Sequence, residues 1–280
     1  MAVKIIIDSA SDITAAEAEV MGIEMIPMSI QFGETEYQAG VNLSACEFYE
    51  KLAGAKELPK TSMINSYRFE EAFQRATKNG DEVLAIVLSS KLSGTYEAAK
   101  QAAAGFDGKV FVVDTLSAAA GERLLCLYAL ELIKQGKSAG QVFDELENAK
   151  HKLCVMAALE TLEYLKKGGR ISSTVAFVGE MLKIKPLVRL IDGEVKMVGK
   201  ARGQKRASAM LNDMVKACGA IDFTMPYGII WTGLDEEVAN NYATECAALL
   251  NGNTAPNYII GSTIGTHIGP GVFGLAFFQK

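Results

Sequence analysis

Short β-rich runs alternate with stretches of helical spacing through the first half of the chain, and this alternation constrains the fold more than any other feature. Residues 3–7, 83–88 and 110–113 are β-rich runs of strand length. Residues 67–78 and 95–104 carry apolar side chains at helical intervals. Buried strands that alternate with helices are typical of a parallel sheet covered on both faces. The first half therefore predicts a mostly parallel α/β sheet.

The second half predicts a smaller sheet of mixed or antiparallel character. Residues 187–191 and 194–198 are β-rich and flank Asp192-Gly193, a dipeptide typical of a tight hairpin. Further expected strands are residues 153–158, 227–232, 258–264 and 272–278. The expected fold is α/β with two domains: residues 1–155 carry the mostly parallel sheet with flanking helices, and residues 156–280 carry the smaller sheet with its helices.

Local signals predict where some elements begin and break. Helix starts are predicted by three capping boxes, Thr14 with Glu17, Ser44 with Glu47, and Ser138 with Gln141. Residues 23–32 are expected to form one strand, and Pro27 within it indicates an edge position or a bulge.

Composition excludes several classes of protein. Hydrophobic residues make up 49% of the chain, enough to offset the entropy of ordering, so a globular protein is expected. No apolar run approaches the ~18 residues that cross a bilayer. The N-terminus lacks the features of a signal peptide, which makes a cytoplasmic location the expectation. The net charge of −5 and the lack of a basic stripe argue against a nucleic-acid partner.

Cysteine and histidine usage argues against a metal site. The five cysteines form no C-x-x-C pair, and we expect them to be buried free thiols. The only two histidines, His151 and His267, are too few for a multi-histidine site. No metal ligand is therefore predicted.

Loops rich in serine, threonine and glycine follow the predicted strands. They are Asp8-Ser9, Thr61-Ser62, Ser89 to Thr95, and Asp114-Thr115. Ligands of open parallel sheets bind beside the carboxyl ends of the strands. Hydroxyls and free N–H groups at a helix start favour an anion. A single hydroxyl such as that of Ser93 would be explained as a helix cap, but several such loops favour a carboxylate or phosphate site.

Three further segments carry candidate polar residues. Gly168-Gly169-Arg170 would let the backbone approach another group and aim a guanidinium at an anion, although an exposed arginine at a helix end is the simpler interpretation. A basic cluster is formed by Lys200, Arg202, Lys205 and Arg206, which fits either a solvated face or an acidic partner. His267 lies in residues 265–271, a glycine-rich run expected to be a stiff loop that presents the ring to a ligand.

Ser93 and His267 also permit an enzymatic interpretation, a serine acyl hydrolase or transferase in which His267 is the base. The sequence around Ser93 is not G-x-S-x-G, which weakens this alternative. The chain also lacks both the P-loop and the G-x-G-x-x-G patterns, so no nucleotide cofactor is predicted.

In their order along the chain, these segments resemble the DegV family of fatty-acid-binding proteins. The matching pieces are Asp8 to Asp12, Pro59 to Ser62, Ser89 to Tyr96, Val112 to Thr115, Leu165 to Ile171, Ile184 to Pro186, Asp192-Gly193, Lys200 to Arg202, and Ile264 to Gly271. One departure is Met63-Ile64, where relatives often have Gln-Pro.

The resemblance implies a carrier that is not itself an enzyme, holds one long-chain fatty acid between its two domains and uses no cofactor. The implied carboxylate-binding residues are Thr61, Ser62, Ser93, Gly94, Thr95 and His267. Such proteins are similar to the binding subunit of bacterial fatty acid kinase, which presents the acid to a separate ATP-dependent kinase subunit for acyl phosphate formation. Arg170 and Arg202 then become candidates for contact with phosphate or with the kinase.

The acyl chain needs an apolar lining, and a carrier of another lipid would need the same. Candidate lining residues are Ile30, Phe177, Met181, Leu182 and Phe277, each of which core packing would explain equally well. A transient contact with a membrane surface is also expected, through an apolar helix at residues 175–184.

Overall fold

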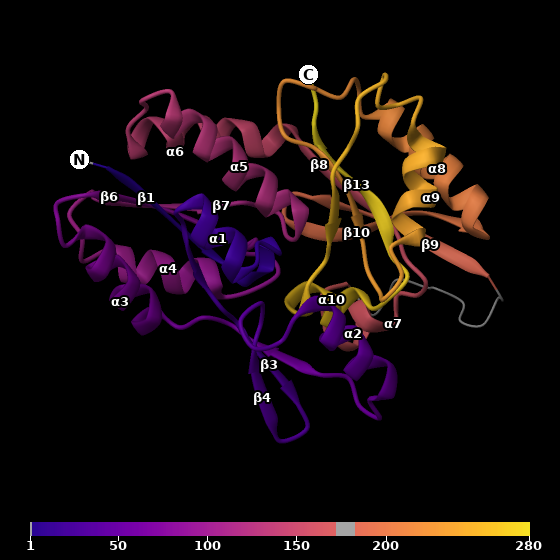
Figure 1. The fold of residues 1–280 in the computed structure, drawn as a ribbon, viewed down its shortest axis with the longest axis horizontal. Helices are drawn as coiled ribbons and strands as arrows, with labels where there is room; N and C mark the ends of the chain where they lie inside the picture. Colours follow the sequence, from indigo (N-terminus) through magenta and orange to yellow (C-terminus); the bar gives the residue numbers. More distant parts are fainter. Residues whose placement is uncertain (1, 172–182) are drawn as a thin grey trace.

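The computed structural model describes residues 2–171 and 183–280. Its N-terminal half holds a four-stranded sheet in the order β2-β1-β6-β7, and every pair of neighbouring strands is parallel (Figure 1). The strands are β1 (Val3–Asp8), β2 (Glu24–Ile26), β6 (Glu82–Val87) and β7 (Val110–Asp114). This confirms the parallel sheet predicted from the first half of the sequence.

Helices cover both faces of this sheet. On one face α3 (Ser66–Thr77) and α4 (Thr95–Ala103) pack against alternate residues of β1 and β6. The other face carries α1 (Ala15–Met21), α5 (Ala120–Lys134) and α6 (Ala139–Ala149). Because both faces are buried, these strands are almost continuously apolar.

The C-terminal half holds a six-stranded mixed sheet in the order β10-β9-β8-β13-β11-β12. Its strands are β8 (Leu153–Ala158), β9 (Ile184–Ile191), β10 (Glu194–Arg202), β11 (Gly228–Trp231), β12 (Asn257–Ile259) and β13 (Phe273–Phe278). All its pairs are antiparallel except β11 with β12. One face packs against α8 (Gln204–Ala217) and α9 (Glu237–Cys246).

The mixed character of this sheet is confirmed, but its predicted smaller size is wrong. It has six strands against four in the parallel sheet. Local sequence patterns find strands without showing which of them pair, so the size of a sheet built from distant strands is not visible in them. β8 begins at Leu153, so it crosses the expected boundary after residue 155. We propose two domains with their boundary just before β8.

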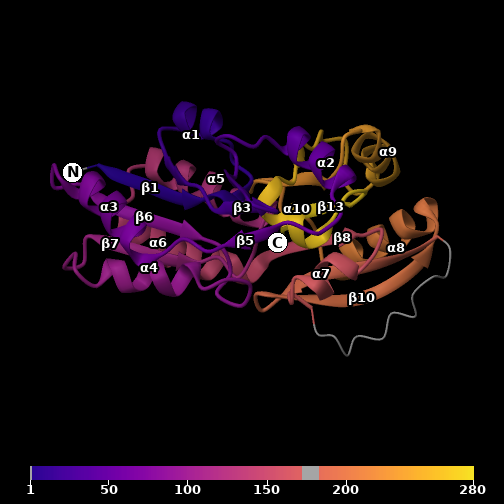
Figure 2. The same cartoon turned by 90° about the horizontal axis from the view of Figure 1, so that it is seen from below.

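A small third sheet lies against the middle of the molecule. It is antiparallel, in the order β4-β3-β5, with β3 (Ser29–Phe32), β4 (Thr35–Gln38) and β5 (Lys60–Ser62). The single strand expected at residues 23–32 is therefore two strands in different sheets, separated at Pro27, which has no N–H for a ladder. β3, β5 and α2 (Ala45–Gly54) contact α10 (Ser262–Ile268) (Figure 2).

α10 takes the place of part of an expected strand and of an expected loop. The strand predicted at residues 258–264 ends at Ile259, and α10 begins at Ser262. His267 therefore lies in the last turn of a helix and not in a glycine-rich loop. Next to α10 lies the short helix α7 (Glu163–Lys167). The three predicted capping boxes at the starts of α1, α2 and α6 are all confirmed.

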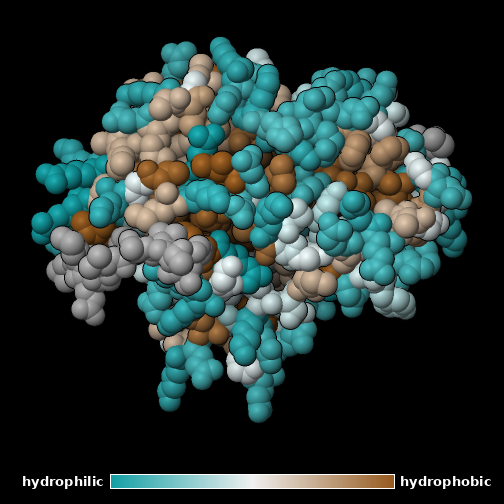
Figure 3. Space-filling view, turned by 180° about the vertical axis from the view of Figure 1, so that it is seen from behind, coloured by the Kyte–Doolittle hydropathy of each residue, from teal (hydrophilic) through white to brown (hydrophobic). Residues whose placement is uncertain are grey.

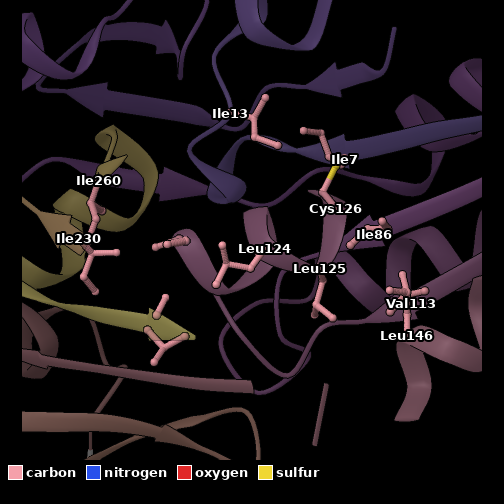
Figure 4. Packing of buried hydrophobic residues seen from close by; sticks show 14 of the residues in the cluster. Ile7, Ile13, Ile86, Val113, Leu124, Leu125, Cys126, Leu146, Ile230 and Ile260 are labelled. Carbon is pink, nitrogen blue, oxygen red and sulfur yellow. The ribbon is translucent and has the colours of Figure 1, made fainter. Parts of the chain in front are cut away.

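One hydrophobic cluster runs from the parallel sheet to the mixed sheet. α5 lies between them, and its Leu124 and Leu125 belong to the same buried cluster as Ile7 and Ile86 of the parallel sheet and Ile230 of the mixed sheet (Figure 4). The rear face of the molecule shows apolar residues gathered in its middle, within a mostly hydrophilic surface (Figure 3). In residues 2–171 and 183–280, no helix combines the length and apolarity needed to span a bilayer.

All five cysteines lie in the described ranges. All five are free thiols, as predicted. Their expected burial holds for Cys126, Cys154 and Cys246 but not for Cys46, which is exposed, or for Cys218, which is half-buried.

Candidate functional site: an apolar cavity with a polar end

A cavity lies between the two large sheets. Its volume of about 330 Å³ is within the range typical of small-molecule sites. Its walls are mostly apolar and come from both halves of the chain. They include Met28, Leu88, Ala118, Val155, Ala157, Leu159, Val188, Leu190, Ile230 and Ile264. Because β8 and β9 are apolar on both faces, the sequence does not show which of their residues face the cavity and which face α8.

The polar lining of the cavity comes from five separate segments. They are β5 with Thr61, the loop between β6 and α4 with Ser93, α10 with His267, the chain after α7 with Arg170, and β9 with Arg189. Thr61 Oγ1 and His267 Nε2 are 3.0 Å apart and share a hydrogen bond across 206 residues of sequence. Ser62 and Gly94 also line the cavity. The structure thus brings together most of the residues predicted to bind a carboxylate.

Ser93 is held by a turn after β6. The N–H groups of Leu92 and Ser93 both donate to Ser89 O, which folds this turn before α4. Ser93 Oγ accepts a hydrogen bond from Thr95 N at 3.3 Å and lies 2.9 Å from Thr95 Oγ1. Thr95 itself is fully buried and does not line the cavity, so its role is to hold Ser93. Gly94 is the cap residue of α4, but Ser93 Oγ still accepts from Thr95 N in the first turn, so Ser93 takes part in capping the helix and also lines the cavity.

His267 is neutral at pH 7. Burial, and secondarily the positive charge of Arg170, lower its pKa to about 4. Its Nδ1 is buried and has no hydrogen-bond partner among the described residues. A neutral imidazole that donates from Nε2 to Thr61 Oγ1 leaves the threonine hydroxyl free to donate to an anion in the cavity.

Arg170 is part of the site, whereas Arg202 is not. Arg170 is half-buried, and its Nε and Nη1 donate to Leu92 O at 3.2 Å and to Gly168 O at 2.5 Å. Burial lowers its pKa from the usual value. The simpler interpretation of Arg170 as an exposed helix-end residue is therefore wrong, because its guanidinium ties the end of α7 to the Ser93 loop. Arg202 is exposed at the end of β10, away from the cavity lining.

The predicted acyl-chain lining is largely corrected. Ile30 is fully buried in the core of the small sheet, with Phe48 and Leu43. Phe277 is fully buried on the face of β13 that packs beneath α8 and α9. Neither lines the cavity. Phe177, Met181 and Leu182 lie outside the described residues, as does the helix expected at residues 175–184 except for its last two residues. The last of these, Ile184, is the first residue of β9 and not helical.

The motif Asp8 to Asp12 supports the cavity walls. Asp8 accepts hydrogen bonds from Ala10 N at 2.7 Å and from Leu88 N at 2.8 Å, which fixes the turn after β1 beside the end of β6. Ser9 Oγ accepts from Met28 N at 2.9 Å and lies 3.1 Å from Thr263 Oγ1. Met28, Leu88 and Thr263 all line the cavity, so this turn acts on the site through its walls.

A cofactor site is not evident in the part of the chain that the structure describes. There, no cluster of three or more histidine, cysteine, aspartate or glutamate side chains has an arrangement that could hold a metal ion.

The fold and the site together define a class: α/β proteins that enclose an apolar cavity between two sheets and line part of it with hydroxyls and a neutral histidine. Comparison with known families shows which family of this class the chain matches. Residues 2–280 match a family described as uncharacterised DegV family proteins. The chain belongs to the DegV family.

Its relatives cover it from end to end. A DegV domain-containing protein from Deinococcus radiodurans is 33% identical over 276 residues, which span 99% of this chain and 98% of the relative. Two solved structures are similar over 100% of both chains. One, described for the fatty acid binding of a DegV family protein from Thermus thermophilus, is 30% identical with a TM-score of 0.89. The other, DegV from Bacillus subtilis, described as a fatty acid binding protein, is 29% identical with a TM-score of 0.84.

Proposed function

We propose that this protein binds one long-chain fatty acid, with the acyl chain in the apolar cavity and the carboxylate at Thr61, Ser93 and His267. The observation that carries the proposal is an apolar cavity with a hydroxyl and a neutral histidine, hydrogen-bonded to each other, in its lining. The fatty acid binding described for the relatives from Thermus thermophilus and Bacillus subtilis supports it.

The donors at the polar end suit a carboxylate. A buried carboxylate needs several hydrogen bonds to replace its hydration. The hydroxyls of Thr61 and Ser93 and the N–H groups at the start of α4 supply neutral donors, while Arg170 adds a positive charge nearby. Each methylene that enters the apolar part of the cavity contributes at most about 0.8 kcal/mol before immobilisation costs.

We further propose that the bound acid is presented to a separate ATP-dependent kinase subunit, which forms the acyl phosphate. Basic side chains support this step: Arg170 lines the cavity, and Lys200 and Arg202 are exposed along β10. An acidic surface and an ATP phosphate are the groups that such side chains attract. Arg202→Ala should slow acyl phosphate formation by the kinase and leave fatty acid affinity unchanged. A loss of affinity would instead assign Arg202 to binding.

The alternative of a serine hydrolase has less support. A nucleophile needs a base within hydrogen-bond reach. Here the Ser93 hydroxyl is paired with Thr95, and the His267 ring is paired with Thr61. Turnover of acyl esters by the isolated chain, abolished by Ser93→Ala, would favour the hydrolase over the carrier.

Native mass spectrometry of the purified protein tests the proposal. We expect a co-purified long-chain fatty acid, released on denaturation, at up to one molecule per chain. A different lipid in the spectrum would support the carrier of another lipid class. A bare protein that also fails to take up added palmitate would overturn the proposed function.

A further inference from the structure

Gly168, at the end of α7, lies directly against the His267 ring. A Cβ added at Gly168 would lie 2.3 Å from His267 Nδ1 and 3.2 Å from its Cε1. The shorter separation is far below van der Waals contact, and the longer one is tighter than most contacts of a Cβ. Because the other ring nitrogen, Nε2, bonds to Thr61 Oγ1, the imidazole contacts both Gly168 and Thr61.

The backbone itself does not require glycine at this position. Gly168 has φ −75° and ψ −11°, a right-handed helical conformation that any residue adopts. The next residue differs, because Gly169 has φ +71° and so favours glycine for conformational reasons. Two other groups therefore explain the glycine at 168: the His267 ring and, less closely, Tyr164 O at 3.1 Å.

The same helix pair makes a reciprocal close contact. A Cβ added at Gly269, just after α10, would lie 2.4 Å from Cε2 of Tyr164 in α7. Each helix thus places an aromatic side chain over a glycine at the end of the other. Gly168 O also accepts the 2.5 Å hydrogen bond from Arg170 Nη1. Gly168 therefore contacts two side chains that line the cavity, His267 and Arg170.

We infer that Gly168 is a positioning residue of the carboxylate site: its missing side chain opens the slot in which the His267 ring reaches Thr61. A methyl group at 168 displaces the ring, breaks the hydrogen bond to Thr61 and lets water reach the imidazole. The effect on ligand affinity rests on the proposed function, whereas the effect on the ring does not.

The experiment compares Gly168→Ala with Gly54→Ala. Gly54 is an exposed residue at the end of α2, and a Cβ there would meet nothing within 4 Å. The ring nitrogens of His267 are followed by NMR through a pH titration, with the exposed His151 as an internal reference. Palmitate affinity is measured on the same variants, and both substitutions are repeated in a His267→Ala background.

We expect Gly168→Ala to shift the His267 ring resonances and raise its titration midpoint, with His151 unmoved and Gly54→Ala silent. Palmitate should bind roughly tenfold or more weakly, as expected for one lost hydrogen bond in a charged network. Without the ring, in His267→Ala, the added methyl should change affinity by no more than about twofold.

Unchanged His267 resonances in Gly168→Ala would overturn the inference, and so would a full affinity loss in the His267→Ala background. If Gly168→Ala does not fold, recovery of folding in Gly168→Ala/His267→Ala supports the clash with the ring. If the double variant does not fold either, the need for glycine at 168 would be explained by the Tyr164 carbonyl, and the inference would be wrong. Wild-type protein that binds no palmitate would contradict the proposed function alone, because the His267 resonances still test whether Gly168 positions the ring.

Discussion

At the scale of single residues, the site depends on the contact between Thr61 and His267. The two side chains come from the small sheet and from α10, and burial keeps the imidazole neutral by lowering its pKa to about 4. When the neutral ring carries its proton on Nε2, it donates to Thr61 Oγ1 and leaves the threonine hydroxyl to donate to a ligand. The orientation of Thr61 toward a ligand thus depends on a residue 206 positions away.

Thr61→Val tests this contact, because valine keeps the shape of threonine and removes its hydroxyl. We expect fatty acid affinity to fall by about 1.5–3 kcal/mol, the contribution typical of a hydrogen bond to a charged group. Isothermal titration with palmitate measures it. Thr35→Val, at an exposed position on β4 of the same sheet, is the matched control. Equal affinities of the two variants would remove Thr61 from the site.

Residue types and the family resemblance predict much of this site, but side-chain direction limits the rest. Hydroxyls and a rare histidine expected after strands made Thr61, Ser93 and His267 candidates, and the resemblance to the DegV family implied their role at a carboxylate. Ile30 and Phe277 were predicted as lining but lie in other cores. Phe277 belongs to a strand buried on both faces, whose residues alternate in direction without changing in character, and Ile30 packs with Phe48 and Leu43 of the small sheet's core. The paired glycines at 168 and 169 predicted a close approach of the backbone to another group, but the sequence did not show that this group is the His267 ring.

At the scale of elements, the turn after β1 shows how helices and strands are joined at the cavity. Asp12 in this turn accepts a hydrogen bond from Gly261 N at 2.8 Å, just before α10. Arg123 of α5 donates to the Asp12 carbonyl at 2.5 Å. Burial raises the pKa of Asp12 to about 8, despite the lowering effects of the Gly261 N–H and Arg123, and the negative charges of Asp8 and Glu17 add to the rise.

Asp12→Asn should change how stability depends on pH. The folded-state pKa of about 8 exceeds the usual 3.8, so the folded protein binds the extra proton. The stability from this proton is fully present below pH 3.8 and is lost as pH rises through 8. Asparagine keeps the acceptor for Gly261 N and does not titrate. The variant should therefore lose less stability than the wild type between pH 5 and 9, by roughly 1 kcal/mol or more.

Urea unfolding across that pH range measures this difference. Asp213→Asn, at an exposed position in α8, is the control and should track the wild type. Parallel curves for wild type and Asp12→Asn would show that the Asp12 carboxyl is ionised in the folded protein.

Elements were predicted best where their signals are local. The capping boxes at Thr14, Ser44 and Ser138 each fix a helix start through bonds within four residues, and all three are present. The strand expected at 258–264 is instead a short strand followed by α10, because Ser262 to Ile268 packs on α2 and α7 and tertiary contacts override its β-rich composition.

At the scale of the whole molecule, two sheets share one continuous core, and the cavity interrupts it. α5 bridges the sheets, so the cavity walls are held from both sides (Figure 4). β8 shows the consequence at one strand: Ala157 faces the cavity, and Ala158 faces α8. Two neighbouring alanines thus lie on opposite faces of β8, one lining the cavity and the other buried in the core beneath α8.

Ala157→Leu and Ala158→Leu test this division. Leucine at 157 enters the cavity, so the preference should shift to shorter fatty acids while stability is retained. Leucine at 158 overpacks the core beneath α8 and should destabilise the fold by about 1–3 kcal/mol. Affinities for a series of chain lengths, together with urea unfolding, measure both effects. An unchanged chain-length profile in Ala157→Leu would place the acyl chain elsewhere.

In the proposed function, the apolar cavity holds the acyl chain, and neutral donors bind its carboxylate near the positive charge of Arg170. Isothermal titration of the wild type with palmitate and with its methyl ester, each delivered to delipidated protein, tests this most directly. We predict one palmitate per chain, and at least roughly tenfold weaker binding of the ester, which lacks the charge but keeps the chain. Equal affinity for acid and ester, or no saturable binding of palmitate, would contradict the account.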